Sequence, residues 1–411
     1  MKYAIIIPDG AADLPLEELD GLTPLAAAET PNMDWIAAEG KCGTVQTIPP
    51  KMPHGSDVAI MSVMGYDPRQ YYTGRAPLEA AARGIEVGAD EWVFRCNLVT
   101  IVDGVMEDYS AGHISTAEAK ILIDKLNRLL ASGHGDSSGF TGTVRFYSGV
   151  SYRHLLTVPA RPGRGSWKDV KTTPPHDIIG KPIEDYLPRG PGSEILVRLI
   201  EQSEAILSTD DVNQVRRDLG ENPATHIWLW GQGKMPKLPP FTKQYGIKSS
   251  ASIAAVDLVR GLSKIIGWEH IEVPGATGYL DTNYEGKGKA AVAALEDHDL
   301  VFVHIEAPDE AGHNGDISGK VRAIEQIDQH IVGPILRYLQ NLDDDWRIMV
   351  LPDHPTPCSI RSHTSEPVPF AIAGTRIVSV AKRHFTEADA EKSDLHVNLG
   401  FELMEYFLKV R

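Results

Sequence analysis

The chain has 411 residues, which is too long for one ordinary compact core and suggests two domains. Hydrophobic residues make up 42% and charged residues 23%, as in ordinary globular proteins, which excludes a chain that stays disordered. The formal net charge of -16 argues against a general nucleic-acid binder or a binder of acidic membranes, because both normally present a basic face.

The three cysteines, Cys42, Cys96 and Cys358, form no CxxC pair, so neither a disulfide framework nor a thiolate zinc site is indicated. The apolar run at the start of the chain stops at Pro8 and is too short for a secretory or membrane-spanning segment. We therefore expect a cytoplasmic protein without nucleic-acid or membrane partners, either a monomer or a small homo-oligomer.

The first predicted element is a buried parallel strand over residues 3–7, which is rich in β-branched residues and ends at a Pro-Asp-Gly turn signal. Asp9 then lies at the carboxyl end of this strand, where ligands collect in open α/β sheets. Asp is also a common turn residue, so this position alone does not decide between the two interpretations.

The segment Pro53-His54-Gly55-Ser56 predicts a tight turn that leads into a helix, with Ser56 at or near the N-cap. A helix N-terminus stabilises both a serine alkoxide and a phosphate attached to it. Serine becomes a nucleophile only with a base or a metal nearby, and from this segment alone a plain capping serine is the favoured interpretation. The chain contains no Gly-x-Ser-x-Gly elbow, P-loop or dinucleotide fingerprint, which argues against the enzyme classes that use them.

The middle of the chain differs in texture from its ends. Strand-like runs occur at residues 92–99, 144–147 and 155–158, and residues 162–188 form a Pro/Gly/Lys-rich irregular stretch. We expect an inserted α+β domain over residues 71–235, within an α/β domain formed by residues 1–70 and 236–411.

The last third of the chain predicts helices over residues 252–266 and 321–339, and strands over residues 299–305 and 346–351. Alternating strands and helices predict a mostly parallel sheet flanked by helices. Both strands are followed by an aspartate, Asp309 and Asp353, and each aspartate has a histidine close by.

Asp309 and His313 are four positions apart, so one helical turn can direct both at one ion. Asp353 and His354 are adjacent at a strand end, and His363 follows on a loop. Each pattern is common by itself. Together, Asp and His without Cys form a set that suits Mn²⁺, Zn²⁺, Co²⁺ or Fe²⁺ and supports phosphoryl transfer by two metals about 4 Å apart.

Asp9, Gly55-Ser56-Asp57, Asp309-x-x-x-His313, Asp353-His354 and His363, in this order, resemble the metal and nucleophile set of the alkaline phosphatase superfamily. Further stretches, among them Gly65-Tyr66-Asp67-Pro68 and Tyr72-Thr73-Gly74-Arg75-Ala76-Pro77, narrow the likeness to archaeal-type cofactor-independent phosphoglycerate mutases over the whole chain. The resemblance implies an alkaline-phosphatase-like core. It also implies an enzyme that interconverts 3- and 2-phosphoglycerate through a phosphoserine, without 2,3-bisphosphoglycerate.

The resemblance further implies one divalent ion bound by Asp309, His313 and His363, and another bound by Asp9, Ser56, Asp353 and His354, with Mn²⁺ favoured. Lys248 resembles the family lysine that contacts the phosphoryl group, although the sequence alone describes it as a surface lysine.

A mutase also needs a domain that closes over the metals, excludes water and holds the glycerate. Candidates for binding the substrate carboxylate lie at predicted strand ends of the inserted domain: Arg95, His113, Arg153 and His154. The general base stays open among Asp103, Asp108, His113 and His154.

Three alternatives remain. Some bacterial relatives within this group are described as proposed homoserine kinases, so a nucleotide-dependent phosphotransferase with the same metals and serine is one of them. A phosphomonoesterase of the same superfamily is the second. The third belongs to another class, a non-catalytic metal-binding or scaffold protein.

Overall fold

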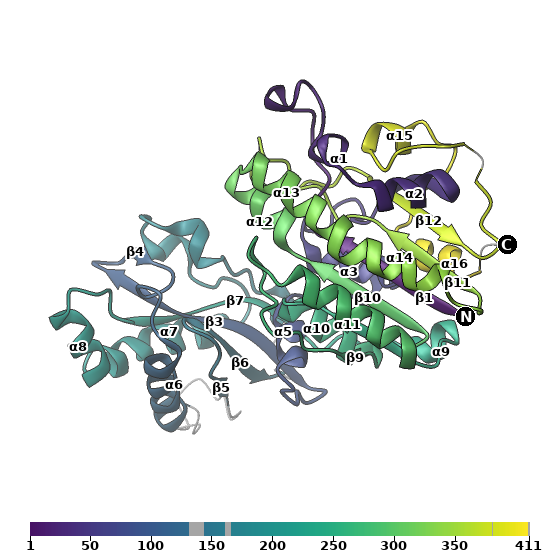
Figure 1. Ribbon diagram of the computed structural model, residues 1–411. Helices are drawn as coiled ribbons and strands as arrows, with labels where there is room; N and C mark the ends of the chain where they lie inside the picture. Colours follow the sequence, from purple (N-terminus) through teal and green to yellow (C-terminus); the bar gives the residue numbers. More distant parts are fainter. Residues whose placement is uncertain (131–143, 161–165, 380, 410–411) are drawn as a thin grey trace. The chain divides into compact units, whose positions relative to one another are not determined.

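The computed structural model describes residues 1–130, 144–160, 166–379 and 381–409. The chain divides into two compact units, coloured along the sequence in Figure 1. Unit 1 combines Met1–Tyr72 with Lys237–Arg411, and unit 2 is the continuous segment Thr73–Pro236. Within the described ranges, no helix is long and apolar enough to cross a membrane.

Unit 1 is built on an eight-stranded sheet of order β13-β2-β12-β11-β1-β10-β8-β9. Its strands are β1 (Lys2–Pro8), β2 (Lys41–Val45), β8 (Ser250–Ile253), β9 (Glu269–His270), β10 (Leu300–Ile305), β11 (Trp346–Val350), β12 (Val368–Gly374) and β13 (His396–Val397). Most neighbouring strands are parallel, whereas β12 runs antiparallel to both β11 and β2. The predicted α/β fold with a mostly parallel sheet is confirmed.

Strand β1 lies in the middle of this sheet, and Ala4 to Ile7 are fully buried, as its β-branched run predicted. It pairs in parallel with β10 on one side and with β11 on the other. The three strands therefore end at the same edge of the sheet, and the loops that follow them start side by side.

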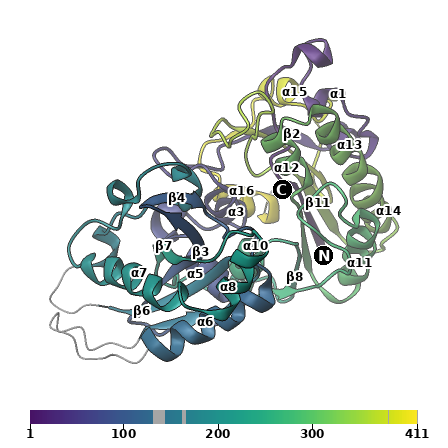
Figure 2. The ribbon, with the colours of Figure 1, turned by 90° about the vertical axis from the view of Figure 1, so that its left-hand side faces the viewer.

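Helices cover both faces of the sheet (Figures 1 and 2). One layer contains α2 (Pro31–Glu39), α11 (Tyr284–Asp297), α13 (Ile317–Ile327) and α14 (Gly333–Gln340), and the other contains α3 (Ser56–Val63), α10 (Asp257–Ile266) and α16 (Glu402–Lys409). The helix predicted over residues 321–339 is confirmed as α13 and α14, joined by a π-helical turn at Asp328–Val332.

The helix predicted over residues 252–266 is wrong at its start, because Ser250–Ile253 form the buried strand β8 and α10 begins only at Asp257. A strand buried on both faces presents a continuous run of small and apolar residues, and periodicity cannot separate such a run from a buried helix.

Unit 2 contains an antiparallel sheet of order β4-β3-β6-β5, in which β3 also pairs with β7. Its strands are β3 (Glu91–Val102), β4 (Val105–Asp108), β5 (Arg145–Tyr147), β6 (Arg153–Pro159) and β7 (His226–Gly233). The longer helices are α6 (Thr116–Leu130) and α7 (Glu194–Leu207). The three predicted strand-like runs are confirmed as β3, β5 and β6.

The long strand β3 gives unit 2 two different sheet faces. Trp92, Phe94, Cys96 and Leu98 enter the main core together with residues of α6 and α7. The residues between them, including Arg95, lie on the opposite face because side chains alternate along a strand.

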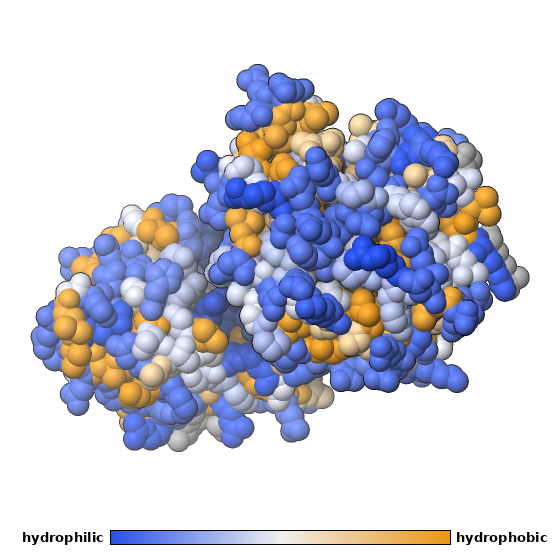
Figure 3. Space-filling model, in the orientation of Figure 1, coloured by the Kyte–Doolittle hydropathy of each residue, from blue (hydrophilic) through white to orange (hydrophobic). Residues whose placement is uncertain are grey.

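The predicted irregular stretch is described from residue 166 onward, where it forms short 3₁₀ turns, and residues 162–165 lie outside the described ranges. On the face of the molecule drawn in Figure 3, hydrophobic residues form small groups among hydrophilic ones.

Candidate functional site

The site of unit 1 lies at the carboxyl edge of β1, β10 and β11. Asp9 follows β1 directly, Asp309 lies on α12 (Ala307–Asn314) after β10, and Asp353 follows β11. Their donor atoms form three groups, each spanning no more than 4.8 Å: Asp309, His313 and His363; Asp9, Asp309 and His354; Asp9, His304 and Asp353. The structure thus brings together all six predicted Asp and His residues and adds His304.

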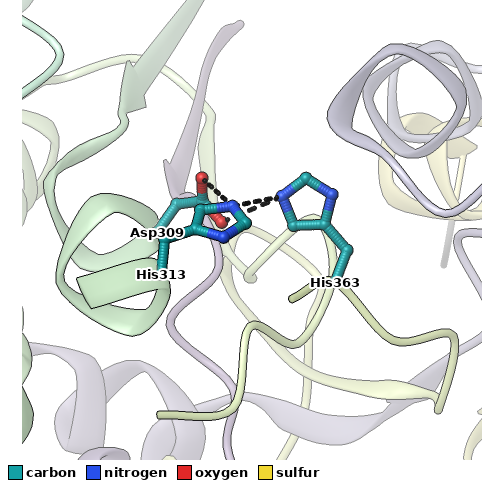
Figure 4. Close-up of side chains that lie close together, drawn as sticks. All are labelled: Asp309, His313 and His363. Carbon is teal, nitrogen blue, oxygen red and sulfur yellow. Dashed lines mark hydrogen bonds and ion pairs between the residues drawn. The ribbon is translucent and has the colours of Figure 1, made fainter. Parts of the chain in front are cut away.

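The outer group is the histidine pair beside Asp309 (Figure 4). The Nε2 atoms of His313 and His363 each lie 3.4 Å from an oxygen of Asp309 and 2.8 Å from each other. On the other side of each ring, Nδ1 faces a backbone carbonyl, that of Arg361 at 3.1 Å for His313 and that of His54 at 3.3 Å for His363. These carbonyls accept from Nδ1–H, so Nε2 is the atom that each ring presents to Asp309, as a donor when the ring is protonated and as a ligand atom when a cation is bound.

The carboxylate and the imidazoles of the outer group shift one another's pKa. The hydrogen bond to Asp309 raises the pKa of His313 to about 9. Although burial opposes it, contact with the two histidines holds the pKa of Asp309 well below its usual range. A metal ion bound here would replace the shared protons as the positive partner of the carboxylate.

The other two donor groups overlap at Asp9 and together form the inner group, which lies beside the candidate nucleophile Ser56. Ser56 is the first residue of α3 after the N-cap Gly55, and it is buried. Its Oγ lies 3.1 Å from Nε2 of His354, and the same nitrogen lies 3.7 Å from Asp9 Oδ1 and 3.4 Å from Asp353 Oδ2. The serine oxygen therefore meets the carboxylate cluster at the N-terminus of a helix, where negative charge is favoured.

The inner group has the properties of a cation site. Asp9 and Asp353 are fully buried, and both oxygens of Asp9 and Oδ2 of Asp353 have no hydrogen-bond partner within the described part of the chain. Burial, followed by the nearby charge of Asp353, raises the pKa of Asp9 well above its usual value. Buried carboxylates without partners are costly unless a cation neutralises them, and this N/O donor set fits a divalent transition metal.

The loops that carry these ligands are held by neighbouring contacts. Thr356 donates to Asp309 Oδ1 at 2.5 Å. Gly10 adopts a φ of +62°, and a Cβ at this position would lie 2.6 Å from Asp309 Oδ1, so only glycine fits. Lys320 of α13 and Asp13 of the loop after β1, whose side chains are fully buried, form an ion pair of 2.7 Å, and Lys320 also donates to the Thr356 carbonyl in the loop after β11.

Unit 2 has a separate cluster of cationic and aromatic side chains. Arg95 is stacked on Trp230, with its guanidinium carbon 4.0 Å from the ring centroid, and its Nε lies 3.3 Å from Glu79. Arg153 lies over the Tyr152 ring at 5.6 Å. Pairing of Arg95 with Leu155 and of Asn97 with Arg153 places both arginines on one face of the sheet.

Three comparisons place the chain among known proteins. A family model described as "2,3-bisphosphoglycerate-independent phosphoglycerate mutase" matches residues 37–213. A protein of that name from Methanosarcina acetivorans is 51% identical over 411 residues, which cover 100% of both chains. The chain belongs to this family.

Other relatives and solved structures are similar to the chain over most of its length. The protein of that name from Methanosarcina mazei is 53% identical over 91% of both chains, and one from Geobacter sulfurreducens, named as probable, is 45% identical over 99% of this chain and all of its own. A solved protein from Pyrococcus horikoshii is 30% identical with a TM-score of 0.81, and covers 99% of this chain and 96% of its own. The solved cofactor-independent phosphoglycerate mutase from Thermoplasma acidophilum is 27% identical with a TM-score of 0.68, and covers 99% of both.

The position of Lys248 contradicts the phosphoryl contact that the family resemblance implied. Lys248 is exposed and precedes Ser250, the first residue of β8. Because β8 and β10 are parallel, with Ser250 beside Leu300, Lys248 lies at the amino edge of the sheet. The Asp and His groups of unit 1 lie at the carboxyl edge, at the other end of the six-residue strand β10, which is about 20 Å long.

His154 also differs from the other substrate-binding candidates. It pairs with Cys96, so it faces the core side of the sheet, opposite to Arg95 and Arg153. Its Nδ1 accepts a hydrogen bond from the Gly149 N–H at 3.0 Å, and burial lowers its pKa to about 3. A neutral, buried imidazole supplies no positive charge for a carboxylate and is a poor proton acceptor, so neither predicted role fits it.

The remaining candidates for substrate binding or general base catalysis are His113, Asp108 and Asp103. His113 packs edge-on against Tyr152 at 5.9 Å, beside Arg153. Asp108 accepts hydrogen bonds from Ser110, Gly112 and Asn222, which, against the effect of burial, lower its pKa and make it a weak base. Asp103 is exposed, with a φ of +48°, in the turn between β3 and β4.

Sequence reasoning missed two features of these sites. His304 lies within the apolar strand β10, where its neighbours suggested only a core position. Trp230 and His176, whose rings are 5.4 Å apart beside Arg95, come from segments without a catalytic motif. Strand pairing brings His304 and Trp230 to their sites, whereas the 3₁₀ turn Pro175–Ile178 brings His176.

Proposed function

We propose that the chain is a metal-dependent phosphoglycerate mutase that interconverts 3- and 2-phosphoglycerate through a phosphoserine at Ser56, without 2,3-bisphosphoglycerate. Membership of the family supports this reaction. The observation that carries the choice of nucleophile is the 3.1 Å contact between Ser56 Oγ and His354 Nε2, at the start of α3 and beside the buried carboxylates of Asp9 and Asp353.

The proposal includes two divalent ions, of which Mn²⁺ is our choice. Asp309, His313 and His363 would hold one ion, and Asp9, Ser56, Asp353 and His354 would hold the other. Bound ions would favour the deprotonated serine oxygen and neutralise the oxygens of the phosphoryl group. The donor atoms of Asp309, His313 and His363, which lie within 4.8 Å of one another, support the first set. The contacts of His354 Nε2 with Ser56, Asp9 and Asp353 support the second.

In the proposed reaction, Ser56 Oγ attacks phosphorus, the bond between Oγ and phosphorus forms, and the bond between phosphorus and O3 of the glycerate breaks. O3 takes up a proton and becomes a hydroxyl group. After the glycerate turns, its O2 hydroxyl loses a proton and attacks the phosphoserine, which releases 2-phosphoglycerate and restores Ser56. The N-terminus of α3 stabilises negative charge at the serine oxygen in both halves of this cycle.

For the substrate carboxylate we propose Arg95 and Arg153 on the shared face of the unit 2 sheet. Arg95 is already oriented by the Trp230 ring and Glu79, so little side-chain freedom is lost when it binds a carboxylate through two hydrogen bonds. His113 adjoins this face through Tyr152.

The direct test is a coupled assay in which 3-phosphoglycerate is the only phosphorylated compound, with Mn²⁺ present and with neither 2,3-bisphosphoglycerate nor a nucleotide. The proposal predicts formation of 2-phosphoglycerate by the wild-type chain and none by Ser56→Ala. Turnover only with homoserine and ATP would establish the phosphotransferase alternative. Release of inorganic phosphate in place of 2-phosphoglycerate would establish a phosphomonoesterase.

A further inference from the structure

His304 is a buried histidine that the proposed metal sets leave out. It lies on β10 opposite Ile7 of β1, and the Asp9 N–H donates to the Ile305 carbonyl at 3.0 Å. The pairing of two central strands therefore fixes the backbones of His304 and Asp9 relative to each other. His304 Nε2 lies 2.9 Å from Asp9 Oδ2, and neither atom has a hydrogen bond to any other described residue.

The two oxygens of Asp9 face different histidines. Oδ1 faces His354, whose Nε2 also contacts Ser56, whereas Oδ2 faces His304. The carboxylate thus has one oxygen on the side of the serine and one oxygen turned away from it. A carboxylate with a free oxygen can rotate and change the atom it offers to an ion, and a fixed nitrogen at Oδ2 restricts that rotation.

His304 is supported from behind by two further side chains. Its Nδ1 lies 3.9 Å from Glu306 Oε2, and its carbonyl accepts a hydrogen bond of 3.4 Å from Nζ of Lys287, a fully buried lysine of α11. Lys287 thus binds the backbone of His304, and a carboxylate lies near the imidazole on the side away from Asp9. A residue present only to fill the core would need no polar group at this position.

We propose that His304 is a positioning residue of the metal centre, which occupies Asp9 Oδ2 and keeps Oδ1 directed toward the ion beside Ser56. The inference rests on the proposed function, because it requires a metal to be bound by Asp9. It assigns His304 no contact with the ion or with the substrate.

The test compares His304→Leu, His304→Gln and the control His270→Leu. His270 is a similarly buried histidine side chain of the same sheet whose Nδ1 contacts Ser252 and no metal-site carboxylate. Each protein is stripped of metal, its thermal midpoint is measured, and Mn²⁺ binding is followed by titration and by metal analysis at saturation. We expect His304→Leu to bind Mn²⁺ about 10- to 100-fold more weakly, at an unchanged number of ions per chain.

The amide nitrogen of His304→Gln reaches close to the position of Nε2, so its loss of affinity should be smaller, and His270→Leu should bind as the wild type does. Wild-type affinity in His304→Leu would show a purely structural role of His304. If His304→Leu does not fold, wild-type affinity in His304→Gln, equal to that of His270→Leu, would show the same. Loss of one ion per chain at saturation would show that His304 is itself a ligand. Both results overturn the inference, whereas a wild-type chain that binds no Mn²⁺ would overturn the proposed function.

Discussion

Replacement of Lys320 by methionine should destabilise unit 1 strongly. Lys320 Nζ lies 2.7 Å from Asp13 Oδ2 and donates to the carbonyls of Ala12 at 3.2 Å and Thr356 at 2.9 Å, with both charged side chains fully buried. Methionine fills a similar volume but leaves the Asp13 carboxylate buried without its cation. Removing one partner of a buried ion pair costs about 3–5 kcal/mol.

Guanidinium unfolding of the metal-free protein measures this cost. The double variant Asp13→Asn, Lys320→Met should recover part of the loss, because an asparagine oxygen in the place of Asp13 Oδ1 can still accept from the N–H groups of Leu14 and Cys358 and carries no charge. The control is Lys289→Met, which breaks an exposed pair with Glu285 and should change stability by no more than about 0.5 kcal/mol.

Lys320→Met should also bind Mn²⁺ more weakly, because Lys320 joins the loops that carry Asp9 and Asp353. A stability change in Lys320→Met as small as that of the control would refute the reasoning. A double variant as unstable as Lys320→Met would also refute it, since the loss would then arise from the missing lysine contacts and not from an uncompensated charge.

Three further predictions concern metal, substrate and pH. A chelator should abolish turnover and Mn²⁺ should restore it, as measured in the coupled assay; full activity after verified metal removal would contradict the two-ion site. Arg95→Lys should raise KM about tenfold or more with a smaller change in kcat, because lysine offers neither paired donors nor a planar group for Trp230; an unchanged KM would exclude Arg95 from the substrate contact. The pKa of His154 is about 3 in the folded chain and about 6.5 when unfolded, so its contribution to stability is complete above pH 6.5 and is lost as the pH falls below that value, by about 2 kcal/mol at pH 5. Denaturation at pH 7 and pH 5 should show a loss about 2 kcal/mol larger in the wild type than in His154→Asn, because other buried histidines with a lowered pKa, such as His270, contribute equally to both proteins.

The parts of the site that follow one strand or one helical turn could be predicted from the sequence. Asp9 and Asp353 follow apolar parallel strands, and the carboxyl ends of such strands meet at one edge. Asp309 and His313 share a turn of α12, as their spacing indicated. The sequence also raised Ser56 and His363 as candidates, but a plain capping serine and a solvated loop histidine fitted these positions too, so the family resemblance decided their expected roles.

The parts that depend on strand pairing could not be predicted. The family resemblance implied that Lys248 contacts the phosphoryl group, but its motif does not show that it precedes a strand and so lies at the amino edge of the sheet. His154 differs by one position from Arg153, and one position along a strand reverses the face. His304 reaches Asp9 only through the register between β10 and β1, which neither strand reveals alone.

The most direct measurement for the proposed mechanism is the location of the phosphoryl group on the enzyme. The metal-loaded chain is mixed with 3-phosphoglycerate, quenched in acid within the first turnovers, digested and analysed by mass spectrometry, with Ser56→Ala treated in parallel. The account predicts phosphate on the peptide that contains Ser56 and none on the variant, which should also be inactive. Phosphate on another residue, or mutase activity retained by Ser56→Ala, would contradict it.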